Sequence, residues 1–134
     1  MSGVLVDSNV LLDIFTEDRR WYSWSAGALA QCADDSVLTI NPIIYAEVSI
    51  RFDTMEELDD VLSEDYFQRL PLPWEAAFLA GKAFLKYRRR RAARRTPLPD
   101  FYIGAHAAIA GLRVLTRDPA RYRSYFPRLS IVAP

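Results

Sequence analysis

Apolar residues follow two patterns along this chain: short unbroken runs, and longer stretches in which they recur every three or four positions. The unbroken runs predict strands buried on both faces, at Val4–Val6, Ser36–Ile40, Val114–Thr116 and Leu129–Val132. The helical spacing predicts helices near Val10–Phe15, Tyr22–Asp34, Ile43–Arg51, Met55–Leu62, Trp74–Arg91, Asp100–Leu112 and Tyr122–Tyr125. Strands that alternate with helices predict an α/β fold, with a mainly parallel sheet covered by helices.

Prolines and capping residues set several of the predicted boundaries. Pro42 and Pro73 suit the first turn of a helix, and Thr54 begins a capping-box pattern. Gly111 is a suitable stop for the helix that precedes it. An extended piece between Tyr66 and Leu72 is expected only at the edge of the sheet, because prolines interrupt it.

The length and composition favour one domain. The 134 residues are enough for one core and too few for two ordinary ones, so residues 1–134 are expected to form a single unit. Cys32 is the only cysteine, which excludes an internal disulfide and favours a reducing cytoplasm. The start of the chain lacks a basic segment, and no apolar run reaches the length of a membrane span. We therefore expect neither a signal peptide nor a membrane anchor.

The acidic residue Asp7 follows the first predicted strand directly. Ser8 and Asn9 come next and favour a sharp turn into a helix. Asp7 is therefore expected at the carboxyl end of a buried strand, which is where open α/β sheets keep their functional sites. A turn or capping aspartate without chemistry is the alternative interpretation.

Glu47 is an acid on an apolar helix face. It lies four residues after Ile43 and three after Ile44, so it is expected to point with them toward the interior. Glutamates are almost never fully buried without a partner. The alternative is a position at the rim of the core, where the carboxylate reaches water or pairs with Arg51.

Two more acids stand at the boundaries of predicted elements. Asp100 begins a helix whose inner face is expected to consist of small residues and one isoleucine, namely Ile103, Gly104, Ala107, Ala108 and Gly111. A plain helix cap would also explain Asp100. Asp118 follows a predicted strand and precedes a proline, a pattern that is common in ordinary turns.

Strand ends and helix starts gather at one edge of a doubly wound sheet, so these four acids are expected to converge there. Carboxylates about 4 Å apart repel by roughly 4 kcal/mol per pair at an effective dielectric constant of about 20. Either some of the acids are protonated or cations lie between them. Ligand sets made only of oxygen favour hard cations, so Mg²⁺ or Mn²⁺ is the expected occupant.

The sequence resembles the PIN-domain nucleases, most closely the VapC toxins of bacterial toxin–antitoxin pairs. The resemblance extends from Val4 to Ile131 and rests on short motifs in a characteristic order. These are Val4-Leu5-Val6-Asp7-Ser8-Asn9-Val10-Leu11-Leu12-Asp13, then Glu47, then Pro97-Leu98-Pro99-Asp100-Phe101-Tyr102-Ile103-Gly104-Ala105-His106-Ala107, then Leu115-Thr116-Arg117-Asp118-Pro119.

The resemblance implies a three-layer α/β/α domain that hydrolyses RNA with bound Mg²⁺ or Mn²⁺. The acids of the family pattern fall on Asp7, Glu47, Asp100 and Asp118, as catalytic residues and metal ligands. Asn9 and Thr116 fall on polar positions that support the site. The resemblance also implies a homodimer and a VapB-type antitoxin that blocks the site.

The charged residues are concentrated in blocks, although the formal net charge is zero. Residues 53–65 hold seven acids and no base, whereas residues 82–95 hold eight bases and no acid. Within the basic block, the run Arg88, Arg89, Arg90 and Arg91 is expected either to bind RNA phosphates or to be a solvated helix end.

Two rival interpretations remain from the sequence. A PIN-like module that binds RNA or a protein without turnover would use the same fold. A phosphatase-like or receiver-like domain also places an aspartate at a strand end. The phosphatase pattern needs an acid two residues later, where this chain has Asn9. The receiver pattern needs paired early acids and a late lysine at a strand end, and neither is present in this sequence.

Overall fold

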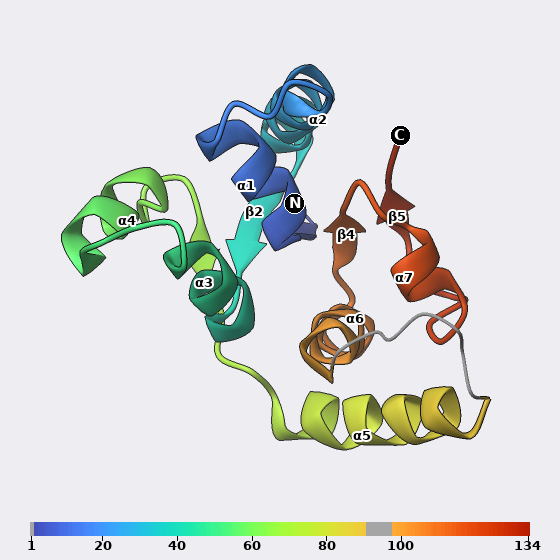
Figure 1. The fold of residues 1–134 in the computed structure, drawn as a ribbon. Helices are drawn as coiled ribbons and strands as arrows, with labels where there is room; N and C mark the ends of the chain where they lie inside the picture. The colour runs from blue at the N-terminus through green and yellow to red at the C-terminus, as the bar shows by residue number, and fades with distance from the viewer. Residues whose placement is uncertain (1, 91–97) are drawn as a thin grey trace.

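Five parallel strands form the central sheet of the protein, in the spatial order β3-β2-β1-β4-β5 (Figure 1). The computed structural model describes residues 2–90 and 98–134. The strands are β1 Gly3–Val6, β2 Val37–Ile40, β3 Gln68–Arg69, β4 Arg113–Leu115 and β5 Ile131–Val132. The parallel sheet predicted from the unbroken apolar runs is confirmed, and β3 is an edge strand as its flanking prolines required.

The helices lie where the apolar periodicity predicted them, with shifts of a few residues at their ends. They are α1 Ser8–Phe15, α2 Tyr22–Asp35, α3 Pro42–Ser49, α4 Met55–Val61, α5 Trp74–Arg89, α6 Leu98–Ala110 and α7 Ala120–Arg123. Thr54 caps α4 by accepting a hydrogen bond from the Glu57 amide, as the capping-box pattern predicted. In the described parts of the chain, no helix is long and apolar enough to cross a lipid bilayer.

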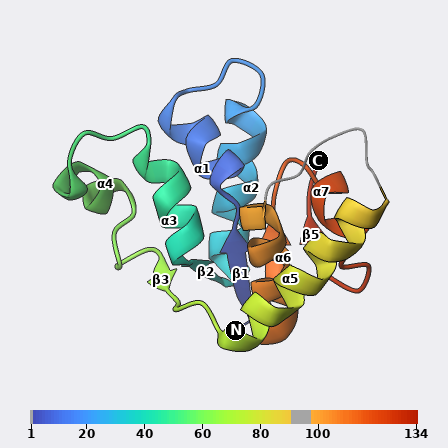
Figure 2. The same cartoon turned by 60° about the horizontal axis from the view of Figure 1, so that its bottom comes forward.

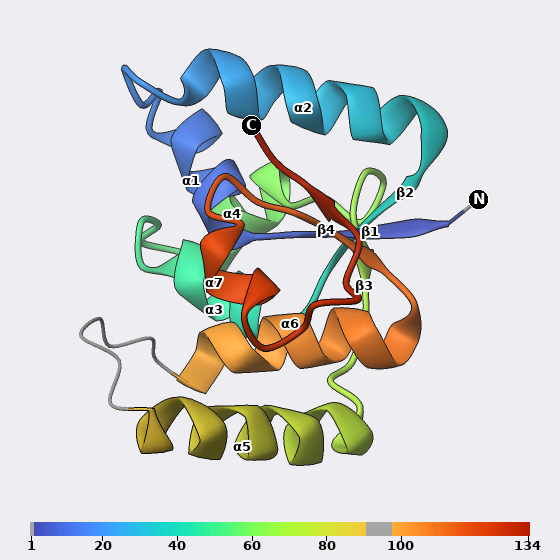
Figure 3. The ribbon, with the colours of Figure 1, turned by 90° about the vertical axis from the view of Figure 1, so that its right-hand side faces the viewer.

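The helices cover both faces of the sheet and give the predicted α/β/α layers. Figure 3 shows α2 on one side of the sheet and α6 on the other, with α5 packed on the outer side of α6. Figure 2 shows α4 beyond α3, on the opposite side of the molecule from α7 and β5. The sheet core includes the three apolar residues of β1, Val4, Leu5 and Val6, none of which is exposed to solvent.

The order of the strands reverses beside β1. The chain first adds β2 and β3 on one side of β1 and later adds β4 and β5 on the other. The helices that follow β1 and β4 therefore diverge from a common point at the carboxyl ends of these strands. Such a switch point leaves an opening in which open α/β sheets bind their ligands.

Helix α6 is packed on two sides, which differs from the single inner face expected from its small residues. Ile103, Gly104 and Ala107 are buried as predicted, but Ala108 and Gly111 are exposed. The second packed side contacts α5 through an aromatic cluster of Phe84, Tyr87, Phe101 and Tyr125. Gly111 ends the helix with a positive φ of 67°, which explains why glycine suits this position.

Gly104 allows α7 to lie directly against α6. A Cβ atom added to Gly104 would lie 2.5 Å from a ring carbon of Phe126 and 3.1 Å from one of Tyr122. Any larger residue would push this segment away from α6. The missing side chain therefore sets how close α7 comes to Asp100, which lies one turn earlier on α6.

The only histidine, His106, is buried between α6 and the end of β2, and its role is structural. The Asn41 side-chain carbonyl accepts a hydrogen bond from the Ile44 amide and caps α3. The Asn41 amide nitrogen must then be a donor, and it lies 3.0 Å from His106 Nδ1. His106 Nδ1 is therefore an unprotonated acceptor, and the imidazole is neutral with its proton on Nε2.

Acid should weaken the fold through His106. Burial lowers the pKa of His106 below its ordinary value of about 6.5. As the pH falls below that value, the unfolded chain takes up a proton that the folded chain does not, so the free energy of unfolding decreases. Above it this contribution is fully present.

Urea denaturation of the wild type and of His106→Gln between about pH 5 and about pH 8 measures this effect. The wild type should lose stability relative to the variant in acid, by about 1.4 kcal/mol for each pKa unit of depression. Parallel stability curves for the two proteins would contradict the neutral, buried imidazole.

Candidate functional site

The polar residues predicted from the sequence lie at the carboxyl ends of β1 and β4. Asp7 follows β1, Thr116 and Asp118 follow β4, and Asp100 is in the first turn of α6. Figure 3 shows β1 running toward α1, with α7 and the start of α6 at the same end of the sheet. Glu47 reaches this edge from α3, and its carboxylate accepts a hydrogen bond from Ser8 of α1.

Asp7 is fully buried, and one of its oxygens is held by several donors. Asp7 Oδ2 accepts hydrogen bonds from the Tyr122 hydroxyl at 2.6 Å and the Thr116 hydroxyl at 3.0 Å. The Asn9 amide lies 3.4 Å from the same oxygen. Among the described residues, Asp7 Oδ1 has only a 3.5 Å contact from the Ser8 hydroxyl. The carboxylate is thus fixed through one oxygen, and the other remains available.

Thr116 and Asn9 join the ends of β1 and β4. The Thr116 hydroxyl donates to Asp7 and accepts from the Asn9 amide at 3.1 Å and the Asp118 backbone amide at 3.0 Å. One donor and two lone pairs are therefore all in use. Asn9 Oδ1 in turn accepts from the Arg117 amide at 3.3 Å. These two side chains fix the position of Asp118 relative to Asp7.

Glu47 is half-buried and is oriented by α1. The Ser8 hydroxyl donates to Glu47 Oε1 at 3.0 Å. Burial raises the pKa of Glu47, and the nearby negative charges of Asp7 and Asp100 act in the same direction. The orientation toward the site matches the prediction from its helix face, and no ion pair with Arg51 occurs within the described residues.

Asp100 and Asp118 meet at the side chain of Arg121. Arg121 Nη1 lies 3.2 Å from Asp100 Oδ1 and 3.9 Å from Asp7 Oδ2, while Nη2 lies 3.5 Å from Asp118 Oδ2. Burial raises the pKa of Asp100, partly offset by the positive charge of Arg121. Burial by itself lowers the pKa of Arg121, but the surrounding carboxylates outweigh it and the pKa is raised.

The carboxylate oxygens gathered here are ligands of the kind that a hard divalent cation prefers. Three carboxyl groups contact one guanidinium, and a fourth, that of Glu47, is hydrogen-bonded to Ser8 next to Asp7. All of the side-chain ligands offered are oxygens, which Mg²⁺ and Mn²⁺ prefer. The raised pKa values of Glu47 and Asp100 reflect burial and unbalanced negative charge nearby. Within the described ranges, no three acidic, histidine or cysteine side chains are close enough to enclose a metal ion as they stand.

Three residues of this network were not recognised from the sequence: Arg117, Arg121 and Tyr122. Arg117 Nε pairs with buried Asp13 at 2.8 Å, which ties the segment after β4 to α1. A short helix was predicted in the segment from Asp118 to Tyr125, but a helix of one turn is too short for its sequence to show which side chains face the site. The signal that was available is the placement of a cation three residues after Asp118.

The basic run at the end of α5 is exposed where it is described. Arg88, Arg89 and Arg90 all face solvent, and the Arg90 guanidinium lies over the ring of Tyr125. Arg91, the fourth residue of the predicted run, is outside the described residues.

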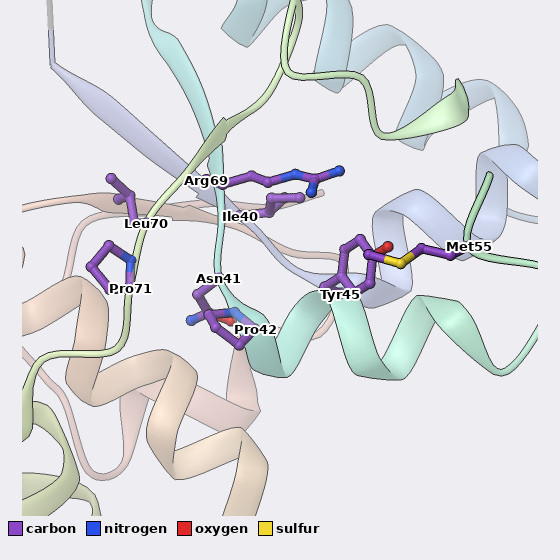
Figure 4. A pocket seen from close by; sticks show the side chains of 8 residues that line it. All are labelled: Ile40, Asn41, Pro42, Tyr45, Met55, Arg69, Leu70 and Pro71. Carbon is purple, nitrogen blue, oxygen red and sulfur yellow. The ribbon is translucent and has the colours of Figure 1, made fainter. Parts of the chain in front are cut away.

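A separate pocket beside β3 contains none of the four acids. It has a volume of about 320 Å³ and lies between α3, α4 and the edge of the sheet (Figure 4). Its lining is mainly apolar and consists of Ile40, Asn41, Pro42, Tyr45, Met55, Arg69, Leu70 and Pro71. With no cluster of acids or nucleophiles in its wall, it is a weaker candidate than the acidic edge.

Comparisons with known proteins agree with this architecture. The family model for the PIN domain matches residues 4–126. Among solved structures, the fold is similar to VapBC-1 from nontypeable Haemophilus influenzae, with a TM-score of 0.73, 15% identity, and coverage of 98% of this chain and 97% of that one. No curated protein sequence matches the chain.

Two other solved structures are also similar in fold to this chain. A toxin–antitoxin complex from Klebsiella pneumoniae has a TM-score of 0.70 and 21% identity, with 96% of this chain and 95% of that chain covered. VapBC2 from Rickettsia felis, bound to a DNA fragment from its promoter, has a TM-score of 0.69 and 14% identity, with 98% of both chains covered.

The Tyr122 hydroxyl should contribute to stability because it donates to a buried carboxylate. Tyr122→Phe removes this donor and should lower the free energy of unfolding by about 1.5–3 kcal/mol, as is usual for hydrogen bonds to charged groups. The matched control is Tyr125→Phe, in the aromatic cluster, which should cost less than about 0.5 kcal/mol. Equal losses in urea denaturation would contradict the role of this hydrogen bond.

Proposed function

This chain belongs to the PIN-domain family, and from that premise we propose that it is an Mg²⁺- or Mn²⁺-dependent endoribonuclease and the toxin of a type II toxin–antitoxin pair. PIN domains are generally nucleases. The observation that carries the proposal is the convergence of Asp7, Asp100 and Asp118 on one guanidinium, with Glu47 bonded beside them. A fold alone does not need four carboxyl groups in one place, because they repel one another.

The proposed roles follow from the contacts of each side chain. Asp7 and Asp100 are the direct metal ligands, and Asp7 would bind through Oδ1, since Oδ2 is already occupied by donors. Glu47 and Asp118 complete the shell or orient the attacking water. Thr116 and Asn9 hold Asp7 and Asp118 in position.

The reaction proposed for this site is hydrolysis of the phosphodiester bond. A bound divalent cation supplies a more acidic water and offsets the charge that develops on the phosphate. Glu47 suits the task of accepting a proton from water, because burial raises its pKa toward neutrality. Attack by water rather than by the ribose 2′-hydroxyl leaves a 5′-phosphate and a 3′-hydroxyl.

The proposed partners are RNA, a VapB-type antitoxin and a second copy of the chain. The support for an antitoxin is the similarity of the fold to several structures of toxin–antitoxin complexes. A homodimer that joins the antitoxin in a hetero-oligomer extends the same analogy. The proposed compartment is the cytoplasm, where the single buried thiol of Cys32 would stay reduced.

The exposed arginines at the end of α5 are proposed to guide RNA toward the site. Arg88, Arg89 and Arg90 present three positive charges to solvent, and phosphate contacts made by such residues release counterions. Arg91 is included in the proposed run on the sequence alone. The alternative is a solvated helix end, for which RNA affinity would show the same salt dependence with or without these charges.

The second candidate function is a PIN-like module that binds RNA or a protein without turnover. The observation in its favour is that the acids, as they stand, do not enclose a metal ion within the described ranges. It predicts RNA binding with no cleavage under any metal condition. The same assay therefore separates the two functions.

The assay compares cleavage of total RNA by the wild type, Asp7→Asn and Asp34→Asn. Cleavage should require Mn²⁺ or Mg²⁺ and stop with a chelator. Asp7→Asn should lower the rate by about a hundredfold or more, since mutation even of residues that only hydrogen-bond to metal ligands lowers metal affinity or activity by roughly 10–100-fold. Asp34 is an exposed acid of α2, so its variant should keep the wild-type rate.

Two results would count against the enzyme. Undiminished cleavage by Asp7→Asn or in the presence of a chelator would remove Asp7 and the metal from the reaction. Products that end in 2′,3′-cyclic phosphate would show that the 2′-hydroxyl, not water, is the nucleophile.

A further inference from the structure

Arg121 is the only cation that the described residues place among the four acids. It lies on α7, its side chain is 27% exposed, and its two terminal nitrogens contact three different carboxylates. Those carboxylates come from three separate parts of the chain: the end of β1, the first turn of α6 and the segment after β4. One side chain thus neutralises charge that three elements bring together.

The guanidinium of Arg121 occupies space beside two of the proposed metal ligands. Its Nη1 lies 3.9 Å from Asp7 Oδ2 and 3.2 Å from Asp100 Oδ1, so one nitrogen contacts both of these carboxylates. A bound Mg²⁺ needs its oxygen ligands at about 2.1 Å, which is much closer than a guanidinium allows. Among the described residues, no three acidic side chains enclose a metal ion in the arrangement that includes this guanidinium.

A divalent cation held by Asp7 and Asp100 would lie beside the guanidinium that already contacts both carboxylates, and the two positive charges would repel each other. It is therefore unfavourable for the Arg121 guanidinium and a divalent cation to contact Asp7 and Asp100 at the same time. The side chain of Arg121 is partly exposed and also contacts Asp118, three residues earlier on the chain, so it has space and a second partner when it moves.

We propose that Arg121 is the resident counter-ion of the acidic site and that a divalent cation binds only by displacing it from Asp7 and Asp100. This inference rests on the metal site of the proposed function. It makes metal binding a competition within one chain, so the affinity for metal is lower than the four acids alone would give. Without metal, Arg121 stabilises the fold by offsetting the repulsion among the acids.

Direct measurement of Mn²⁺ binding tests the competition without relying on activity. Free Mn²⁺ is followed by its electron paramagnetic resonance signal during titration of the full chain, in the wild type, Arg121→Gln and Arg123→Gln. Arg121→Gln should bind Mn²⁺ about tenfold more tightly, within the 5–150-fold range usual for coupled binding. Arg123 is an exposed arginine on the same helix, so its variant should stay within about twofold of the wild type.

A charge-preserving variant and a stability measurement cover the case in which Arg121→Gln folds poorly. Arg121→Lys keeps the positive charge and should bind Mn²⁺ with an affinity closer to the wild type than to Arg121→Gln. Arg121→Gln should have a lower Tm than the wild type without metal and should gain more in Tm from Mn²⁺, because tighter binding to the folded state stabilises it more.

The outcomes separate this inference from the function on which it rests. Equal or weaker Mn²⁺ binding by Arg121→Gln overturns the counter-ion role and leaves the metal site intact. Equally tight binding by Arg121→Lys and Arg121→Gln overturns it as well, since charge would not be the cause. Absence of Mn²⁺ binding in every folded variant overturns the metal site itself and the competition with it.

Discussion

The mutual repulsion of four carboxyl groups is the constraint on which the rest of this structure depends. Asp7 and Asp100 are buried, where a carboxylate without partners is strongly unfavourable. The fold meets this cost with hydrogen bonds from Tyr122 and Thr116 to Asp7 and with the guanidinium of Arg121. A protein that had to be stable and nothing more would have little reason to bury these acids.

The C-terminal segment supplies two of those partners, Tyr122 and Arg121. Because Gly104 has no side chain, α7 lies against α6, and the Tyr122 hydroxyl comes within hydrogen-bonding distance of Asp7. Arg117 holds the start of the same segment to Asp13 on α1. Rigid positioning of this kind is what a site for metal and phosphate needs, since small displacements of ligands weaken binding and catalysis.

The sequence predicted the scaffold and singled out the four acids with Asn9 and Thr116 beside them, but it did not predict the contributions of Arg121 and Tyr122. Unbroken apolar runs located β1, β2 and β4. Asp7, Asp100 and Asp118 were singled out because they stand at strand ends or a helix start, and Glu47 because it lies on an apolar helix face, all of which are local patterns. Arg121 and Tyr122 act through contacts with Asp7 over more than a hundred residues of chain, and no local pattern encodes such contacts. The exposure of Ala108 was missed for a related reason, since the position of α5 on α6 depends on tertiary packing.

The central claim is that the acids at the ends of β1 and β4 form one cation site. Anomalous diffraction from crystals of the full chain grown with Mn²⁺ tests it most directly. The account predicts a manganese peak at Asp7 and Asp100, with the Arg121 guanidinium moved away from both. Saturating Mn²⁺ with no peak at these carboxylates, and with Arg121 still between them, would contradict it.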